Sequence, residues 1–122
     1  MEVIVDPDAA TNTGSYSPAL KFGQFVMVSG QGPLSPEGEI VSGTVEEETR
    51  LTMTNIKKYI EATGATMDQV VKCNCFLEKM SDFDAFDAVY REFFKDNLPC
   101  RTTVGAGLLG IKVEIDAMAF VG

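Results

Sequence analysis

Two short segments carry the side chains best suited to chemistry in this sequence. Arg101 follows Leu98-Pro99-Cys100 and begins a strand-like segment, where its guanidinium could bind a carboxylate through two parallel hydrogen bonds. The alternative for this arginine is a salt bridge to an acidic residue at the sheet edge. Glu114 lies on the polar side of the last predicted strand and could act as a general base if burial raised its pKa. A solvated or salt-bridged carboxylate is the alternative.

A segment with two glycines, Ser29-Gly30-Gln31-Gly32, could present backbone N–H groups at the mouth of a pocket. The alternative is an ordinary turn at the end of a strand. Groups of this kind can hold an anion and position a water molecule. We therefore expect modest chemistry in which a reactive substrate does most of the work.

The residue types that are missing or scarce narrow the chemistry further. The chain contains no histidine, which excludes Ser-His-Asp and Cys-His nucleophilic catalysis and histidine-ligated zinc or iron sites within this chain. Cys73 and Cys75 are too few for a metal site, and we interpret them as core residues. Lys72 and Lys112 lie in predicted strands without a neighbour pattern that would activate an amine, so Schiff-base chemistry has no support. We expect no metal site.

The composition is that of an ordinary globular protein. With 122 residues, 45% of them hydrophobic, we expect one compact domain over residues 1–122. The net charge of −8 argues against nucleic acid binding, which depends on Lys and Arg contacts to phosphates. Segment 1–14 has no Lys or Arg, and no apolar run approaches the roughly 20 residues of a membrane span. We therefore expect a soluble, cytoplasmic protein without a targeting peptide.

The first half of the chain must position the glycine segment. The apolar runs 19–22 and 25–29 around Gly23-Gln24 predict a β-hairpin, and residues 30–33 predict a loop. Residues 39–41 predict a short strand. Thr44 followed by Glu47 is a capping box, which predicts a helix that begins there and ends near Gly64.

The second half must position Arg101 and Glu114. Segment 70–78 alternates as a strand, with Val71, Cys73, Cys75 and Leu77 on one face. Ser81 is the expected cap of a second helix with an apolar stripe of phenylalanine and tyrosine, which ends at residues 97–99. Strands follow over 101–104 and 112–121. This order predicts an α+β fold with two helices on one face of a sheet.

The last strand indicates a contact with another subunit. One of its faces is uniformly apolar and suits the helices: Val113, Ile115, Ala117, Ala119 and Val121. Its other face combines two carboxylates with Met118 and Phe120. Two helices can cover only one side of a sheet, so we expect this second face to meet another subunit. The alternative is a pair of scattered exposed apolar residues, which is common.

Four ordered motifs resemble the YjgF/YER057c/UK114 family, also called the Rid family of reactive intermediate deaminases. They are Gly14-Ser15-Tyr16-Ser17-Pro18-Ala19, Val28-Ser29-Gly30-Gln31, Pro99-Cys100-Arg101-Thr102-Thr103-Val104 and Lys112-Val113-Glu114-Ile115-Asp116-Ala117. The match extends over essentially the whole chain. The resemblance implies a chorismate-mutase-like α+β fold with a mixed sheet, and a homotrimer whose sheets form a central barrel with three clefts between subunits.

The resemblance also implies an activity without a cofactor. Members close to the deaminase archetype hydrolyse enamines and imines such as 2-aminoacrylate and 2-iminopropanoate to 2-oxo acids and ammonia. A non-catalytic protein that binds small carboxylates such as 2-oxo acids, or a chaperone-like protein, is the alternative. A ribonuclease that inhibits translation is a third possibility, which the acidic charge disfavours.

The family's site residues carry over by position. Arg101 corresponds to the arginine that binds the substrate carboxylate, and Glu114 to the glutamate associated with the substrate or its attacking water. The positions that line the cleft are matched by Tyr16, Ser29, Gly30 and Thr103, the last of which is a cysteine in many members. Asp87 lies where asparagine is frequent. A carboxylate there would weaken binding of an anionic substrate unless it is paired.

Overall fold

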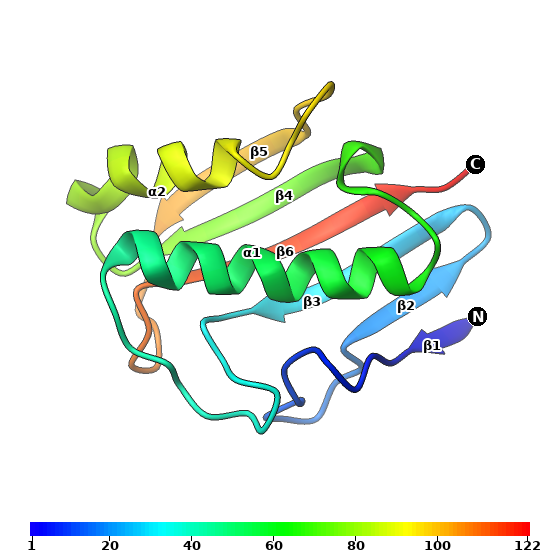
Figure 1. Cartoon of the computed structure of the whole chain (residues 1–122), viewed down its shortest axis with the longest axis horizontal. Helices are drawn as coiled ribbons and strands as arrows, with labels where there is room; N and C mark the ends of the chain where they lie inside the picture. Colours follow the sequence, from blue (N-terminus) through cyan, green and yellow to red (C-terminus); the bar gives the residue numbers. More distant parts are fainter.

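The fold is a six-stranded mixed sheet covered on one face by two helices, as Figure 1 shows in a computed structural model that describes all residues 1–122. The strands are β1 (Glu2–Ile4), β2 (Ala19–Phe22), β3 (Phe25–Gln31), β4 (Val70–Leu77), β5 (Cys100–Gly105) and β6 (Val113–Phe120). The helices are α1 (Val45–Ala62) and α2 (Phe83–Arg91), with short 3₁₀ turns at Met67–Gln69 and Met80–Asp82. The predicted α+β class is confirmed.

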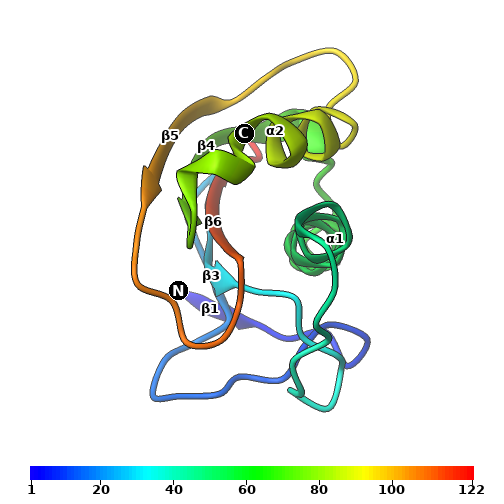
Figure 2. The same ribbon diagram turned by 90° about the vertical axis from the view of Figure 1, so that its left-hand side faces the viewer.

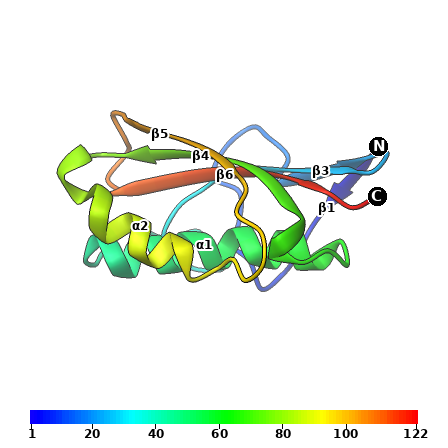
Figure 3. The same ribbon diagram turned by 90° about the horizontal axis from the view of Figure 1, so that it is seen from above.

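The sheet has the strand order β1-β2-β3-β6-β4-β5. Every neighbouring pair is antiparallel except β4 and β5, which run parallel and are joined through α2. Figure 3, the view from above, shows both helices on the same side of the sheet, and Figure 2 shows the same layers from the side. The opposite face of the sheet therefore has no covering element within this chain.

The first helix forms for the reasons that the sequence indicates. Thr44 Oγ1 accepts a hydrogen bond from the Glu47 N–H at 3.1 Å, and Glu47 Oε1 accepts one from the Thr44 N–H at 2.9 Å. This capping box satisfies two amide groups that the first turn of a helix leaves without partners. Met53, Ile56 and Ile60 are fully buried beneath the helix.

The core lies between the helices and the sheet, and β4 and β6 contribute alternate residues to it. Cys73, Cys75 and Leu77 of β4 are fully buried, as are Val113 and Ile115 of β6. The predicted core role of both cysteines and the two faces of the last strand are thus confirmed.

Several predicted details are wrong. Those that concern the strands are explained by local shifts in the pairing register. Val71 is 40% exposed, because a register shift between Val70 and Lys72 against β6 turns Val70 inward instead. Gly30 and Gln31 are not loop residues. They belong to β3, which pairs with β6 across a similar shift between Val28 and Gln31.

Other differences concern short elements. Residues 39–41 form no strand, since only Ile40 makes an isolated bridge to Leu34. The short strand β1 is missing from the prediction, because three residues carry too little periodicity. Ser81 does not cap α2: it lies within the 3₁₀ turn that leads to Asp82, and α2 ends at Arg91 rather than at residues 97–99.

Candidate active site

Arg101 projects from β5 toward the helix side of the sheet and is fixed there by α2. Its Nη1 donates a hydrogen bond to Asp87 Oδ1 at 2.5 Å, in an ion pair whose side chains are 23% and 47% exposed. The guanidinium carbon lies 5.3, 5.5 and 4.8 Å from three ring centroids, those of Phe83, Phe86 and Tyr90. Cation–π attraction and the ion pair together hold the guanidinium in one orientation.

The same arginine borders an opening in the surface. A cavity of about 300 Å³ is lined by Asp87, Tyr90 and Arg101 together with Leu98 and Pro99. Within this chain only Nη1 of Arg101 donates to a carboxylate, so its other N–H groups are free to bind an anion. Thr103 lies two residues further along β5 on the same face, and its buried Oγ1 has no hydrogen-bond partner.

Glu114 projects from β6 toward the opposite, uncovered face of the sheet. Its carboxylate lies against Gly30 of β3, where an added Cβ would come within 3.0 Å of Oε2. A larger residue at position 30 would therefore push the Glu114 side chain out of its present position. Burial is the main cause that raises the pKa of Glu114 above its ordinary value, and the nearby charge of Asp116 adds to the shift.

Tyr16 and Gly30 line a cavity of about 440 Å³ together with Glu114. They also line a second cavity of about 490 Å³, which contains Ser29 and Asp116. Ser29 is fixed by the hydrogen bond that its Oγ donates to the Ser17 carbonyl at 2.6 Å. Four of the predicted site residues therefore gather at one place: Tyr16, Ser29, Gly30 and Glu114.

The remaining predicted residues, Arg101, Asp87 and Thr103, form a separate group. Strand β4 lies between β5 and β6, and Cys73 of β4 pairs with both Arg101 and Ala117, three residues from Glu114. With a strand spacing of about 4.8 Å and a rise of about 3.3 Å per residue, the Cα atoms of Arg101 and Glu114 are about 14 Å apart. Their side chains also point to opposite faces, so one chain does not bring the two groups onto one small substrate.

Two features of the site were not predicted from the sequence. The alternative for Arg101, a salt bridge, is present in the structure, but its acid is Asp87 of α2 rather than a sheet-edge residue. The apolar stripe of α2 predicts core residues only, whereas its aromatic residues Phe83, Phe86 and Tyr90 also contact the guanidinium of Arg101. Their spacing on one helix face opposite the strand of Arg101 is the signal that could have indicated this contact.

The described chain has no group of three or more His, Cys, Asp or Glu side chains arranged to hold a metal ion. None of its helices combines the length and the apolar character needed to span a membrane.

This chain matches known proteins over nearly its full length. Residues 7–121 match the family model described as Endoribonuclease L-PSP. A RutC family protein of Pyrococcus abyssi is 38% identical, with 98% of this chain and 96% of that protein covered. A Dermatophagoides farinae protein named 2-iminobutanoate/2-iminopropanoate deaminase is also 38% identical, with coverage of 98% and 95%.

A solved structure supports the same relationship. Escherichia coli TdcF, crystallised with bound serine, superposes with a TM-score of 0.93 at 30% identity and complete coverage of both chains. The chain therefore belongs to the YjgF/YER057c/UK114 family, to which the motifs around Tyr16, Ser29, Arg101 and Glu114 had indicated a resemblance.

Proposed function

We infer that this protein hydrolyses reactive 2-imino acids and their enamine tautomers, of the 2-iminopropanoate and 2-aminoacrylate type, to 2-oxo acids and ammonia. The observation that carries the proposal is Arg101, whose guanidinium is oriented by α2 and keeps N–H groups free beside a cavity. A fixed guanidinium with free donors is suited to the carboxylate of a small substrate. The name of the Dermatophagoides farinae relative supports the same reaction.

The active site proposed here lies between copies of the chain in a homotrimer. Arg101 and Glu114 point to opposite faces of the sheet, so a cleft that contains both must take one from each of two copies. The uncovered face of the sheet carries exposed apolar side chains suited to such a contact, among them Met27, Phe25 and Phe120. Covering them with another copy would remove this apolar surface from water.

In the proposed reaction Arg101 binds the substrate carboxylate, and the backbone at Gly30 and Thr103 orients the rest of the substrate. Glu114 accepts a proton from a water molecule while the water oxygen attacks C2 of the protonated imine. Protonated Glu114 then returns this proton to the nitrogen of the resulting carbinolamine. Its C–N bond then breaks, ammonia leaves and the hydroxyl loses its proton to give the 2-oxo acid.

The chemistry suits the residues available. The protonated imine is already electrophilic, so the protein has to supply orientation, a proton acceptor and an anion site, and the proposal requires no cofactor. A carboxylate with a raised pKa accepts a proton from water more readily than an ordinary glutamate does. Burial of Glu114 provides this property.

The test generates the imine in situ with an amino-acid oxidase and follows release of ammonia and 2-oxo acid. We expect wild-type protein to accelerate release above the rate in buffer and Arg101→Ala to lose at least about 100-fold of that acceleration. Arg50→Ala is the matched control, because Arg50 is also ion-paired, to Glu92, but lies on the surface of α1. Equal rates for wild type and Arg101→Ala would contradict the mechanism.

A second candidate is binding of small carboxylates without turnover. Bound serine in the TdcF structure favours it, since that relative holds a small molecule with a carboxylate. Calorimetry with 2-oxobutanoate separates the two functions: binding that depends on Arg101, in a protein that does not hydrolyse the imine, would favour this candidate.

A further inference from the structure

Two loops frame the cavity in which Glu114 lies. The first loop, residues 32–43, connects β3 to α1 and contributes Leu34 and Ile40 to the cavity wall. The second loop, residues 106–112, connects β5 to β6 and contributes Leu108 and Ile111. The shape of the cavity therefore depends on how these loops are held relative to each other.

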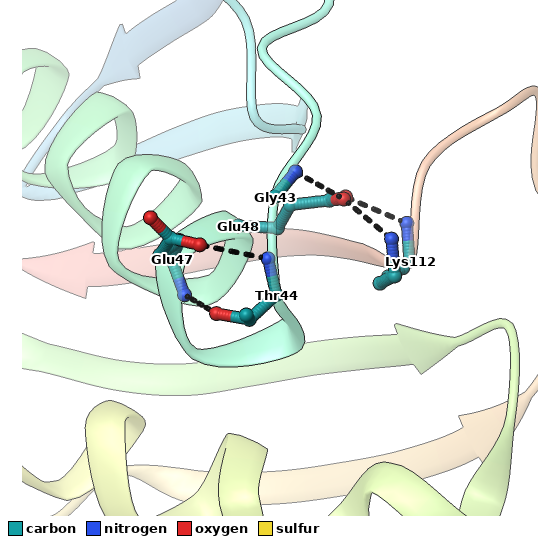
Figure 4. A network of polar contacts seen from close by, with 5 residues as sticks. All are labelled: Gly43, Thr44, Glu47, Glu48 and Lys112. Carbon is teal, nitrogen blue, oxygen red and sulfur yellow. Dashed lines mark hydrogen bonds and ion pairs between the residues drawn. The ribbon is translucent and has the colours of Figure 1, made fainter.

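A single buried carboxylate touches the end of both loops. Glu48 lies in the first turn of α1, and its side chain is only 2% exposed. Its Oε1 accepts a hydrogen bond from the Lys112 backbone N–H at 2.9 Å, and its Oε2 accepts from the Gly43 N–H at 3.2 Å and from Lys112 Nζ at 3.1 Å (Figure 4). Gly43 closes the first loop and Lys112 closes the second.

The position of Lys112 connects this cluster to the proposed chemistry. Lys112 directly precedes β6, and Glu114 follows two residues later. Ile111, the neighbour on its other side, contributes to the cavity wall. The hydrogen bond from the Lys112 N–H to Glu48 thus fixes the position at which β6 begins. It thereby also fixes the part of the strand that holds Glu114 against Gly30.

Burial of the Glu48 carboxylate is unfavourable unless its charge is paired and hydrogen-bonded. All three donors to Glu48 come from the ends of the two loops. Asn55 repeats the pattern two turns further along α1: its side chain is 1% exposed and donates to the carbonyls of Gly32 at 3.1 Å and Leu34 at 3.0 Å, both in the first loop.

We propose that Glu48 is a positioning residue for the cavity of Glu114: by joining Gly43 and Lys112 it holds the two loops together and places the Glu114 carboxylate for the attacking water. The activity readout of this role rests on the proposed imine hydrolysis. The role itself is a property of the loops and can be measured without any substrate.

The decisive comparison is Glu48→Ala against Glu47→Ala. The two glutamates are neighbours in the first turn of α1, but Glu47 serves only the capping box with Thr44. We expect Glu48→Ala to lower kcat by about 10- to 100-fold, since a misplaced reacting group has effects of that size. Its KM should change little because Arg101 binds the substrate carboxylate. Glu47→Ala should leave both constants within about twofold of wild type, since it leaves the hydrogen bonds from Gly43 and Lys112 to Glu48 in place.

Amide hydrogen exchange supplies the readout without activity. In Glu48→Ala the Gly43 and Lys112 amides lose their acceptor, so their exchange should accelerate by about tenfold or more, and in Glu47→Ala it should not. If Glu48→Ala does not fold, Glu48→Gln keeps the shape and one acceptor, and it should show a smaller loss of kcat and of protection at the same two amides.

The outcomes are separable. Equal losses of kcat in the two alanine variants, or unchanged exchange at Gly43 and Lys112 in Glu48→Ala, would overturn the positioning role. A wild-type protein that hydrolyses no imine would instead refute the proposed function. The exchange measurement would then still decide whether Glu48 holds the loops.

Discussion

Substitution of Asp87 should increase the affinity of the protein for small carboxylates. Its carboxylate occupies Nη1 of Arg101, so a substrate carboxylate that binds the free N–H groups brings a second negative charge to the same guanidinium. Asp87→Asn removes the repulsion between the two anions. The asparagine oxygen can still accept the Nη1 hydrogen bond, and the three aromatic rings still orient the guanidinium. We therefore expect tighter binding of 2-oxo and 2-imino acids.

The size of the effect follows from the geometry. Two carboxylates on one guanidinium lie about 5.5 Å apart, and Coulomb's law with an effective dielectric of about 20 gives a repulsion of about 3 kcal/mol. Asp87 is 47% exposed, so solvent screening lowers this value to about 1–2 kcal/mol. That range corresponds to a Kd about 5- to 30-fold lower in Asp87→Asn than in wild type.

Isothermal calorimetry with 2-oxobutanoate measures this change. Asp84→Asn is the matched control, because Asp84 is exposed on the same helix, carries the same charge and makes no salt bridge in this chain. The gain in Asp87→Asn should shrink as salt is added, since screening already weakens the repulsion in wild type. Equal or weaker binding by Asp87→Asn at low salt would refute the reasoning.

Three further predictions follow from the same structure. Protonated Glu114 cannot accept a proton, so the rate of hydrolysis should fall with decreasing pH. The midpoint should lie above 4.5, because burial and, to a smaller extent, the charge of Asp116 raise the pKa of Glu114. Asp116→Asn should therefore move the midpoint of the pH–rate profile lower. Thr44→Ala breaks the capping box and should lower the free energy of unfolding by about 1 kcal/mol in urea titrations, whereas an unchanged midpoint would contradict the cap's role. A thiol reagent should modify one cysteine in the folded protein, the exposed Cys100, and three after unfolding, since burial raises the pKa of Cys73 to about 11; modification of all three at one rate would disagree.

Periodicity allowed the main elements to be predicted. The capping box at Thr44 and the stripe of Met53, Ile56 and Ile60 determine α1 locally, because a helix places side chains three and four residues apart on one face. The alternation of β6 likewise separates Glu114 from its buried neighbours Val113 and Ile115. A strong local pattern thus predicts that an element exists, although the cap and the end of α2 were predicted wrongly.

Features that depend on the register with a partner strand were not predicted. The pairing of β3 with β6 keeps Gly30 and Gln31 in a strand although glycine and proline follow closely, and a register shift reverses the expected orientation of Val71. The three-residue strand β1 exists only because β2 offers it a partner. Hydrogen bonds between distant segments decide such cases, and a local pattern contains no record of them.

The same division holds for the candidate site. Residue types and local patterns limit the available chemistry: there is no histidine, an arginine follows Pro99-Cys100, and a glutamate lies on the polar side of the last strand. Strand order and packing pair Asp87 with Arg101, let Glu48 join the two loops, and turn Arg101 and Glu114 to opposite sides of the sheet. Residue type fixes charge and reactivity, whereas strand order, register and packing fix the distances and directions between groups.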